Sequence, residues 1–167
     1  MPESDSLGRV PVASTPRDRF IEYLQSRGMR VTQQRLALVE HVFSRHEHFD
    51  ADQLMEQLPA SGSAGHVSRP TVYRTLSELV DAGLLRKFTL NSRAVYEHDY
   101  GYPQHDHFHC TQCNRLLEFE NEKLVRLRDE VAREHRFRVA GHRLIITGVC
   151  EECSRASRRA RHKMNMI

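Results

Sequence analysis

The stretch Ser68–Leu85, SRPTVYRTLSELVDAGLL, decides the fold. Serine is a favoured helix N-cap, proline suits the first turn, and a glycine in the left-handed conformation often ends a helix. Ser68, Pro70 and Gly83 therefore predict one helix across most of this stretch. Apolar residues recur at helical spacing along it and predict a buried stripe, made of Val72, Leu76, Leu79 and Val80.

The opposite face of this helix is polar and basic, mainly in its N-terminal half, and carries Arg69, Thr71, Tyr73, Arg74 and Ser77. After Gly83 the hydrophobic period changes to that of two strands around a turn at residues 91–93. Helices followed by such a hairpin describe a winged helix-turn-helix, whose last helix enters the DNA major groove with its N-terminal half. An ordinary helical bundle with an exposed Arg/Tyr face is the alternative.

Three shorter helices are predicted before this stretch. The first contains Phe20 and ends at Gly28, and the second is capped by Thr32. The third begins with a capping box formed by Asp50 and Gln53 and stops before Pro59. The glycine- and serine-rich residues 59–68 predict a loop.

Composition favours a soluble globular protein, since 28% of the 167 residues are charged and 39% are hydrophobic. No apolar run is long enough to span a bilayer, and the N-terminus has no apolar signal segment, so a cytoplasmic location is expected and no membrane partner. The net charge is only +3. The segment SRASRRARHK at 154–163 holds five Lys/Arg and no acidic residue, and it suits either nucleic-acid contact or a solvated disordered tail.

The four cysteines form two C-x2-C pairs, Cys110/Cys113 and Cys150/Cys153. Four thiolates complete a closed tetrahedral zinc site with no position left for water, so the predicted zinc is structural. Such an ion contributes on the order of 10 kcal/mol to folding, so loss of one cysteine is expected to unfold this part of the chain. A redox dithiol is the weaker alternative.

From about His105 the sequence predicts a second, small unit of strand, helix and strand. His105 and His107 share one face of an extended segment, which His109 would also share, while Asp106 points the other way. An H-x-H beside a zinc knuckle predicts a second metal site suited to Fe, Mn, Ni, Co or Zn. Another pair of histidines, His46 and His48, lies in the first domain. No role is expected for the other histidines, which are His41, His66, His98, His135, His142 and His162.

Several motifs, in this order, resemble the ferric uptake regulator (Fur) family of bacterial metal-responsive transcriptional repressors: GMRVTQQR, TVYRTL, DAGLL, HDHFHC and the two C-x2-C pairs. The resemblance covers residues 20–153. It implies an α+β chain with an N-terminal winged helix-turn-helix domain plus a C-terminal α/β dimerisation domain. The expected boundaries are a flexible arm at 1–18, the DNA-binding domain at 19–99, a hinge at 100–104, the zinc-stapled dimerisation domain at 105–154 and a basic tail at 155–167.

The resemblance also implies residue roles, carried over position by position. The DNA-contacting residues are expected to be Tyr73 and Arg74 in the recognition helix and Arg30 near the minor groove or backbone, with Arg69 and Thr71 beside them. The cysteines match the structural zinc site. The regulatory metal site matches His48, Glu97, His105, His107 and Glu118.

A regulatory ion held by this set would take ligands from both domains and so fix the angle between them, which in a homodimer sets the spacing of the two recognition helices on a palindromic operator. Nitrogen and oxygen donors suit Fe²⁺ or Mn²⁺, and iron is favoured. Zinc, manganese and peroxide sensors of the same family are alternatives.

One departure from the family concerns a further metal site that some members hold in the dimerisation domain. Asp106 matches it weakly, whereas Gln104, Val125 and Val149 stand where ligands are expected. No catalytic residue or small-molecule substrate is expected. The competing functions are a metallohydrolase with an open metal position and a zinc-stapled module that binds protein.

Overall fold

The computed structural model describes residues 11–164, with side chains as far as Ser157. These residues divide into two compact units, 11–103 and 104–164. The first ten residues of the predicted arm and the last three of the basic tail lie outside the described range. Within that range, no helix is both long enough and apolar enough to cross a membrane.

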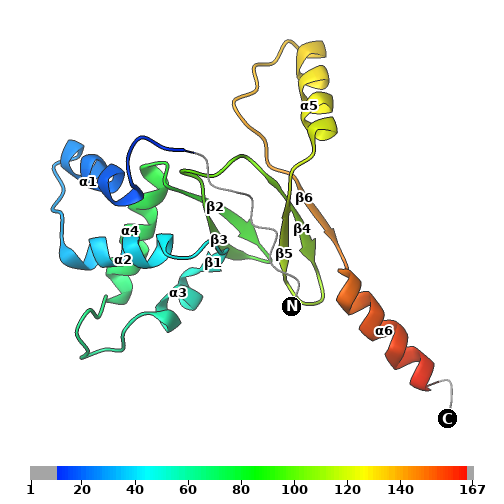
Figure 1. Cartoon of the computed structure of the whole chain (residues 1–167), viewed down its shortest axis with the longest axis horizontal. Coiled ribbons are helices and arrows are strands. Elements are labelled where there is room, and N and C mark those ends of the chain that lie inside the picture. The colour runs from blue at the N-terminus through cyan, green and yellow to red at the C-terminus, as the bar shows by residue number, and fades with distance from the viewer. Residues whose placement is uncertain (1–10, 165–167) are drawn as a thin grey trace. The chain divides into compact units, whose positions relative to one another are not determined.

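The unit 11–103 is a winged helix-turn-helix (Figure 1), with four helices, a hairpin and a short third strand. Its elements are α1 Pro16–Ser26, α2 Gln33–Phe43, β1 Phe49–Asp50, α3 Ala51–Gln57, α4 Arg69–Asp81, β2 Leu85–Leu90 and β3 Arg93–His98. The predicted capping of α2 by Thr32 and the capping box at Asp50 and Gln53 are both present. Gly28 and Gly83 follow α1 and α4 with φ of 65° and 68°, in the left-handed region that glycine adopts without strain.

The helices and the hairpin of this unit share one hydrophobic core. The helical stripe predicted for α4 is buried at Val72, Leu76 and Leu79, and Val80 packs at its edge. The other fully buried large side chains come from α1, α2 and the start of the wing, and are Phe20, Leu24, Leu38, Val39, Leu84 and Leu85. The polar face of α4 is thereby turned outward.

Two details of this unit differ from the sequence expectation. Ser68 stands at the N-cap of α4, but its hydroxyl bonds the Thr71 hydroxyl at 2.8 Å rather than a backbone N–H. The strand β1 was not predicted, because two residues carry no readable alternation. It pairs antiparallel with β3, with Phe49 opposite Tyr96, and completes a sheet of order β1-β3-β2.

The unit 104–164 is built on a second sheet of order β5-β4-β6. Its elements are β4 Asp106–Cys110, β5 Leu116–Phe119, α5 Glu122–Glu134, β6 Ile145–Gly148 and α6 Glu151–Met164. β4 runs antiparallel to β5 and parallel to β6. In Figure 1 the helix α5 stands away from the three strands, and none of its residues is buried.

The end of this unit departs from the sequence expectation in two ways. The strand expected across residues 137–150 forms only at Ile145–Gly148. The basic segment 154–163 lies within the helix α6, Glu151–Met164, so within the described residues the alternative of a disordered tail is wrong.

Candidate metal centres and DNA-contacting surface

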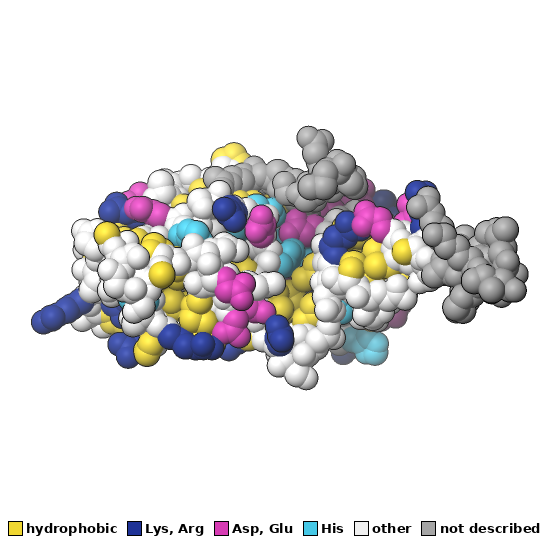
Figure 2. Space-filling model, turned by 90° about the horizontal axis from the view of Figure 1, so that it is seen from below, with side chains coloured by type: hydrophobic (Ala, Val, Ile, Leu, Met, Phe, Trp, Pro, Cys, Tyr) yellow, Lys and Arg dark blue, Asp and Glu magenta, His cyan; other side chains and the backbone are white. Residues whose placement is uncertain are grey.

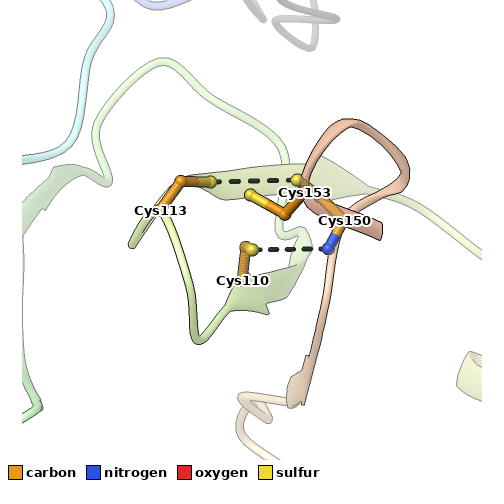
Figure 3. Close-up of side chains that lie close together, drawn as sticks. All are labelled: Cys110, Cys113, Cys150 and Cys153. Atoms are coloured by element: carbon orange, nitrogen blue, oxygen red, sulfur yellow. Dashed lines mark hydrogen bonds between the residues drawn. The ribbon is translucent and has the colours of Figure 1, made fainter. Parts of the chain in front are cut away.

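The four cysteines come together from four segments of the unit 104–164 (Figure 3). Cys110 ends β4, Cys113 lies in the turn before β5, Cys150 follows β6, and Cys153 lies in the first turn of α6. Their sulfur atoms all lie within 4.8 Å of one another, and all four are free thiols. The cluster therefore fits one tetrahedral ion bound by four sulfur atoms.

The electrostatics of the cluster favour thiolate character at two positions. The Cys150 backbone N–H donates to Cys110 Sγ at 3.3 Å. That contact, with further backbone N–H groups, lowers the pKa of Cys110 to about 5. The backbone N–H of Cys153 lowers the pKa of Cys150. The pKa of Cys153 rises to about 12, because its thiol is held by hydrogen bonding to Cys150 and its neighbours. The thiols thus share their charge unevenly until a cation draws all four into the thiolate form.

In the unit 11–103, His48 and Glu97 lie side by side. The β1–β3 register puts Phe49 opposite Tyr96, so the residues just outside that pair, His48 and Glu97, also face each other. His48 Nε2 is 3.4 Å from Glu97 Oε2. A short strand that the sequence did not reveal therefore positions one imidazole and one carboxylate together.

In the unit 104–164, His105, His107 and Glu118 form a second group of nitrogen and oxygen donors. His107 is the cross-strand partner of Glu118 in the β4–β5 ladder. His105 Nε2 is 3.7 Å from Glu118 Oε1, and the two imidazole rings lie 4.9 Å apart between centroids. His109, further along β4, is buried.

Asp106 belongs to a different cluster from its histidine neighbours. Its carboxylate accepts hydrogen bonds from the backbone N–H of Leu144 and from His142 Nε2, each at 3.1 Å. Val125 and Val149 are exposed and offer no donor atom. His142, for which the sequence suggested no role, is thus the partner of Asp106, and their separation of 36 residues left no local pattern to reveal it.

The surface expected to contact DNA is the N-terminal half of α4. Arg69 and Arg74 are exposed and Tyr73 is 41% exposed, whereas Thr71 is half-buried with its hydroxyl against Ser68. Arg30 is exposed in the turn before α2. Exposed arginine and tyrosine side chains on one helix provide donors for phosphates and base edges.

A buried ion pair joins α2 to α4. Arg35 Nη2 lies 2.7 Å from Glu78 Oε1, and both side chains are largely buried. Burial raises the pKa of Glu78, and the charges of Arg35 and Arg74 oppose that rise. The pair fixes the orientation of α4 relative to α2.

Comparison with known proteins gives one consistent family. The model of the ferric uptake regulator family matches residues 26–147. The ferric uptake regulation protein of Neisseria gonorrhoeae is 33% identical over 142 residues, covering 83% of this chain and 96% of that protein. The peroxide-responsive repressor PerR of Staphylococcus aureus is 30% identical over 138 residues, covering 81% of this chain and 90% of that protein.

A solved structure supports the same relationship in three dimensions. The ferric uptake regulator of Francisella tularensis, determined with iron, superposes with a TM-score of 0.65 and is 29% identical. The match covers 76% of this chain and 96% of that chain. Similarity therefore extends over both units of the fold.

Proposed function

This chain belongs to the ferric uptake regulator family of metal-responsive transcriptional repressors, and we propose that it binds operator DNA as a homodimer when iron(II) is loaded. The observation that carries the proposal is the grouping of His105, His107 and Glu118 on two paired strands, beside a separate all-cysteine site. The all-cysteine site suits permanently bound zinc, and the group of histidines and glutamate suits an exchangeable ion.

We propose that the regulatory ion takes ligands from both donor groups, His48 with Glu97 and His105, His107 with Glu118. Each group alone supplies too few ligands for the near-octahedral shell that Fe²⁺ or Mn²⁺ prefers, and the two groups belong to different units of the chain. An ion that binds the closed arrangement better than the open one shifts the population toward it by that difference in affinity. The four cysteines are proposed to hold Zn²⁺ permanently.

Iron is the proposed effector because the donor set is nitrogen and oxygen, and because all four cysteines are gathered in one other cluster. The related Francisella tularensis regulator was solved with iron. Manganese and zinc suit the same donors, and the similarity to a peroxide-responsive repressor makes peroxide sensing the nearest alternative. Members of this family act as transcription factors, and no catalytic residue is assigned.

A homodimer is supported by apolar surface that the single chain leaves uncovered (Figure 2). Phe108, Leu117 and Ile146 are neighbours across β5-β4-β6 and are 43%, 41% and 39% exposed. On the helix side, Leu127, Val131 and Phe137 are 55%, 46% and 71% exposed. A unit this small is marginal without further burial, so we propose that a second copy covers both surfaces.

The test is DNA binding by the purified dimer under anaerobic titration with Fe(II), Mn(II) or Zn(II), with bound metal measured first. His107→Ala is expected to abolish metal-stimulated binding to the operator while the protein keeps its zinc and its dimeric mass, because the switching ion alone is lost. His41→Ala is the matched control, since the His41 side chain bonds only Gln57 within the described residues, and this variant should respond as the wild type does.

Two results would count against the proposal in different ways. Normal metal-stimulated binding by His107→Ala would reject the regulatory ligand set. Stimulation by Zn(II) or Mn(II) without stimulation by Fe(II) would reject iron as the effector and leave the ligand set standing.

A further inference from the structure

Three side chains of the unit 104–164 contact the imidazole ring of His142. At one end, the buried carboxylate of Asp106 lies 3.1 Å from His142 Nε2. At the other end, Arg128 Nη1 lies 2.9 Å from His142 Nδ1. The Gln104 side-chain nitrogen lies 2.7 Å from the same Nδ1 and 2.6 Å from the His142 carbonyl oxygen.

The hydrogen-bond partners fix which nitrogen of His142 carries the proton. Arg128 offers only N–H donors, and the Gln104 nitrogen is a donor too, so Nδ1 must be the acceptor. The proton therefore lies on Nε2 and is donated to Asp106. The Nδ1 lone pair, which is the only one that the neutral ring has, is shared by the Gln104 nitrogen at 2.7 Å and the Arg128 guanidinium at 2.9 Å.

This geometry is the one in which proteins hold a metal ion on histidine. A metal-bound imidazole commonly donates its other N–H to a carboxylate, which orients the ring and raises its basicity. Here the carboxylate and the ring are in place, and a guanidinium occupies the position of the cation. The further metal that some family members bind does not fit these residues, because N–H donors of Arg128 and Gln104 both face the one free lone pair of His142.

We infer that Arg128 takes the place of a divalent cation at His142, so that this cluster is a metal-free anchor built into the chain. It joins β4 through Asp106, the segment before β6 through His142 and Leu144, and α5 through Arg128. Since Figure 1 shows α5 standing away from the strands, the anchor is a direct tie of that helix to the rest of its unit. This tie persists whether or not any metal is bound.

The exchange of cations can be tested by substitution. Arg128→Ala combined with Gln104→His removes the internal cation and adds a second imidazole beside His142. We expect this variant to bind one more Co(II) or Zn(II) per protomer than the wild type, counted by elemental analysis and by the Co(II) absorption bands. Only the difference in count matters, so the outcome does not depend on the regulatory site proposed above.

The single variant Arg128→Ala supplies a second readout in case the double variant folds poorly. Without the guanidinium, the melting temperature of protein carrying only its tightly bound zinc should fall. The exposed Arg126 of the same helix, which pairs with Glu122, is the matched control, and Arg126→Ala should leave the melting temperature unchanged. An unchanged count in a folded double variant, or equal melting of Arg128→Ala and the wild type, would overturn the inference.

Discussion

At the scale of single residues, the surface of α4 proposed to contact DNA contains one arginine, Arg69, that already forms an ion pair within the protein. Arg69 Nη2 lies 2.7 Å from Asp52 Oδ1 on α3, and its guanidinium carbon lies 5.8 Å from the centre of the Tyr73 ring. An exposed ion pair adds little stability, so its effect is on orientation. Asp52 holds Arg69 beside Tyr73, so part of the Arg69 guanidinium is engaged within the protein and not free for a phosphate.

Asp52→Asn should therefore lower the sequence specificity of DNA binding without lowering the affinity for DNA. The freed Arg69 can meet a phosphate, so affinity for random duplex should rise relative to operator. The slope of log affinity against log salt should also steepen by about one. Fluorescence anisotropy on both duplexes across a salt series measures this effect. Glu56→Gln, which removes the same charge from the same helix, is the control, and an equal response in both variants would assign the effect to net charge alone.

At the scale of elements, the orientation of α4 depends on the buried pair of Arg35 and Glu78. A carboxyl whose pKa is raised by burial takes up a proton more readily in the folded state than in the unfolded chain. Its contribution therefore favours the fold most at low pH and is lost as the pH rises above the ordinary value of 4.5. The positive charge of Arg35 makes the rise in the Glu78 pKa smaller, but burial still keeps that pKa above its ordinary value.

Glu78→Gln should lower the free energy of unfolding, because the amide replaces the carboxyl oxygen that accepts the 2.7 Å hydrogen bond from the buried guanidinium of Arg35. The difference in free energy of unfolding between the wild type and this variant should nevertheless shrink as the pH rises from about 4 to 7. Only the wild type loses stability over this range, since the amide of the variant has no proton to lose. Urea unfolding at several pH values gives the free energies of unfolding of both proteins. Glu40→Gln, in an exposed pair with Arg17, provides the control. A difference that widens with pH would contradict the assigned direction of the Glu78 pKa.

At the scale of the whole molecule, the cysteine cluster fastens both ends of one unit. It joins the β4–β5 turn to the junction of β6 and α6. Along the chain, these two places are separated by β5, α5 and the long segment that leads from α5 to β6. Because a bound ion would cross-link these segments, its removal should release the sheet and the apolar surfaces proposed to form the dimer.

Cys113→Ser should accordingly lose zinc and dimeric mass together. Zinc content by elemental analysis and mass by light scattering are the two measurements, and the circular dichroism of the remaining winged helix shows whether the first unit stays folded. Ser154→Ala, beside the cluster, should change neither quantity. A stable dimer of Cys113→Ser without zinc would reject the structural role of the ion.

Local signals in the sequence revealed much of this architecture, and paired segments far apart did not. Capping at Thr32 and Asp50 and the stripe of α4 are set within a few residues, so they were readable in advance. The β1–β3 pairing and the contact of His142 with Asp106 join distant segments and carry no local period. The donor grouping of His105, His107 and Glu118 agrees with the resemblance, although the resemblance, not the periodicity, selected Glu118.

The pairing of Phe49 with Tyr96 has a consequence for chain entropy. It closes a loop over residues 49–96 that contains α3, most of the wing, and α4, the helix proposed to contact DNA. His48 and Glu97 lie next to the two ends of that loop, so an ion bound by both would cross-link those ends. In the chain-entropy treatment of cross-links, closing a loop of this size removes up to about 4 kcal/mol of conformational freedom from opened states. The effector would then protect residues 49–96, which include the helix proposed to contact DNA, against local unfolding.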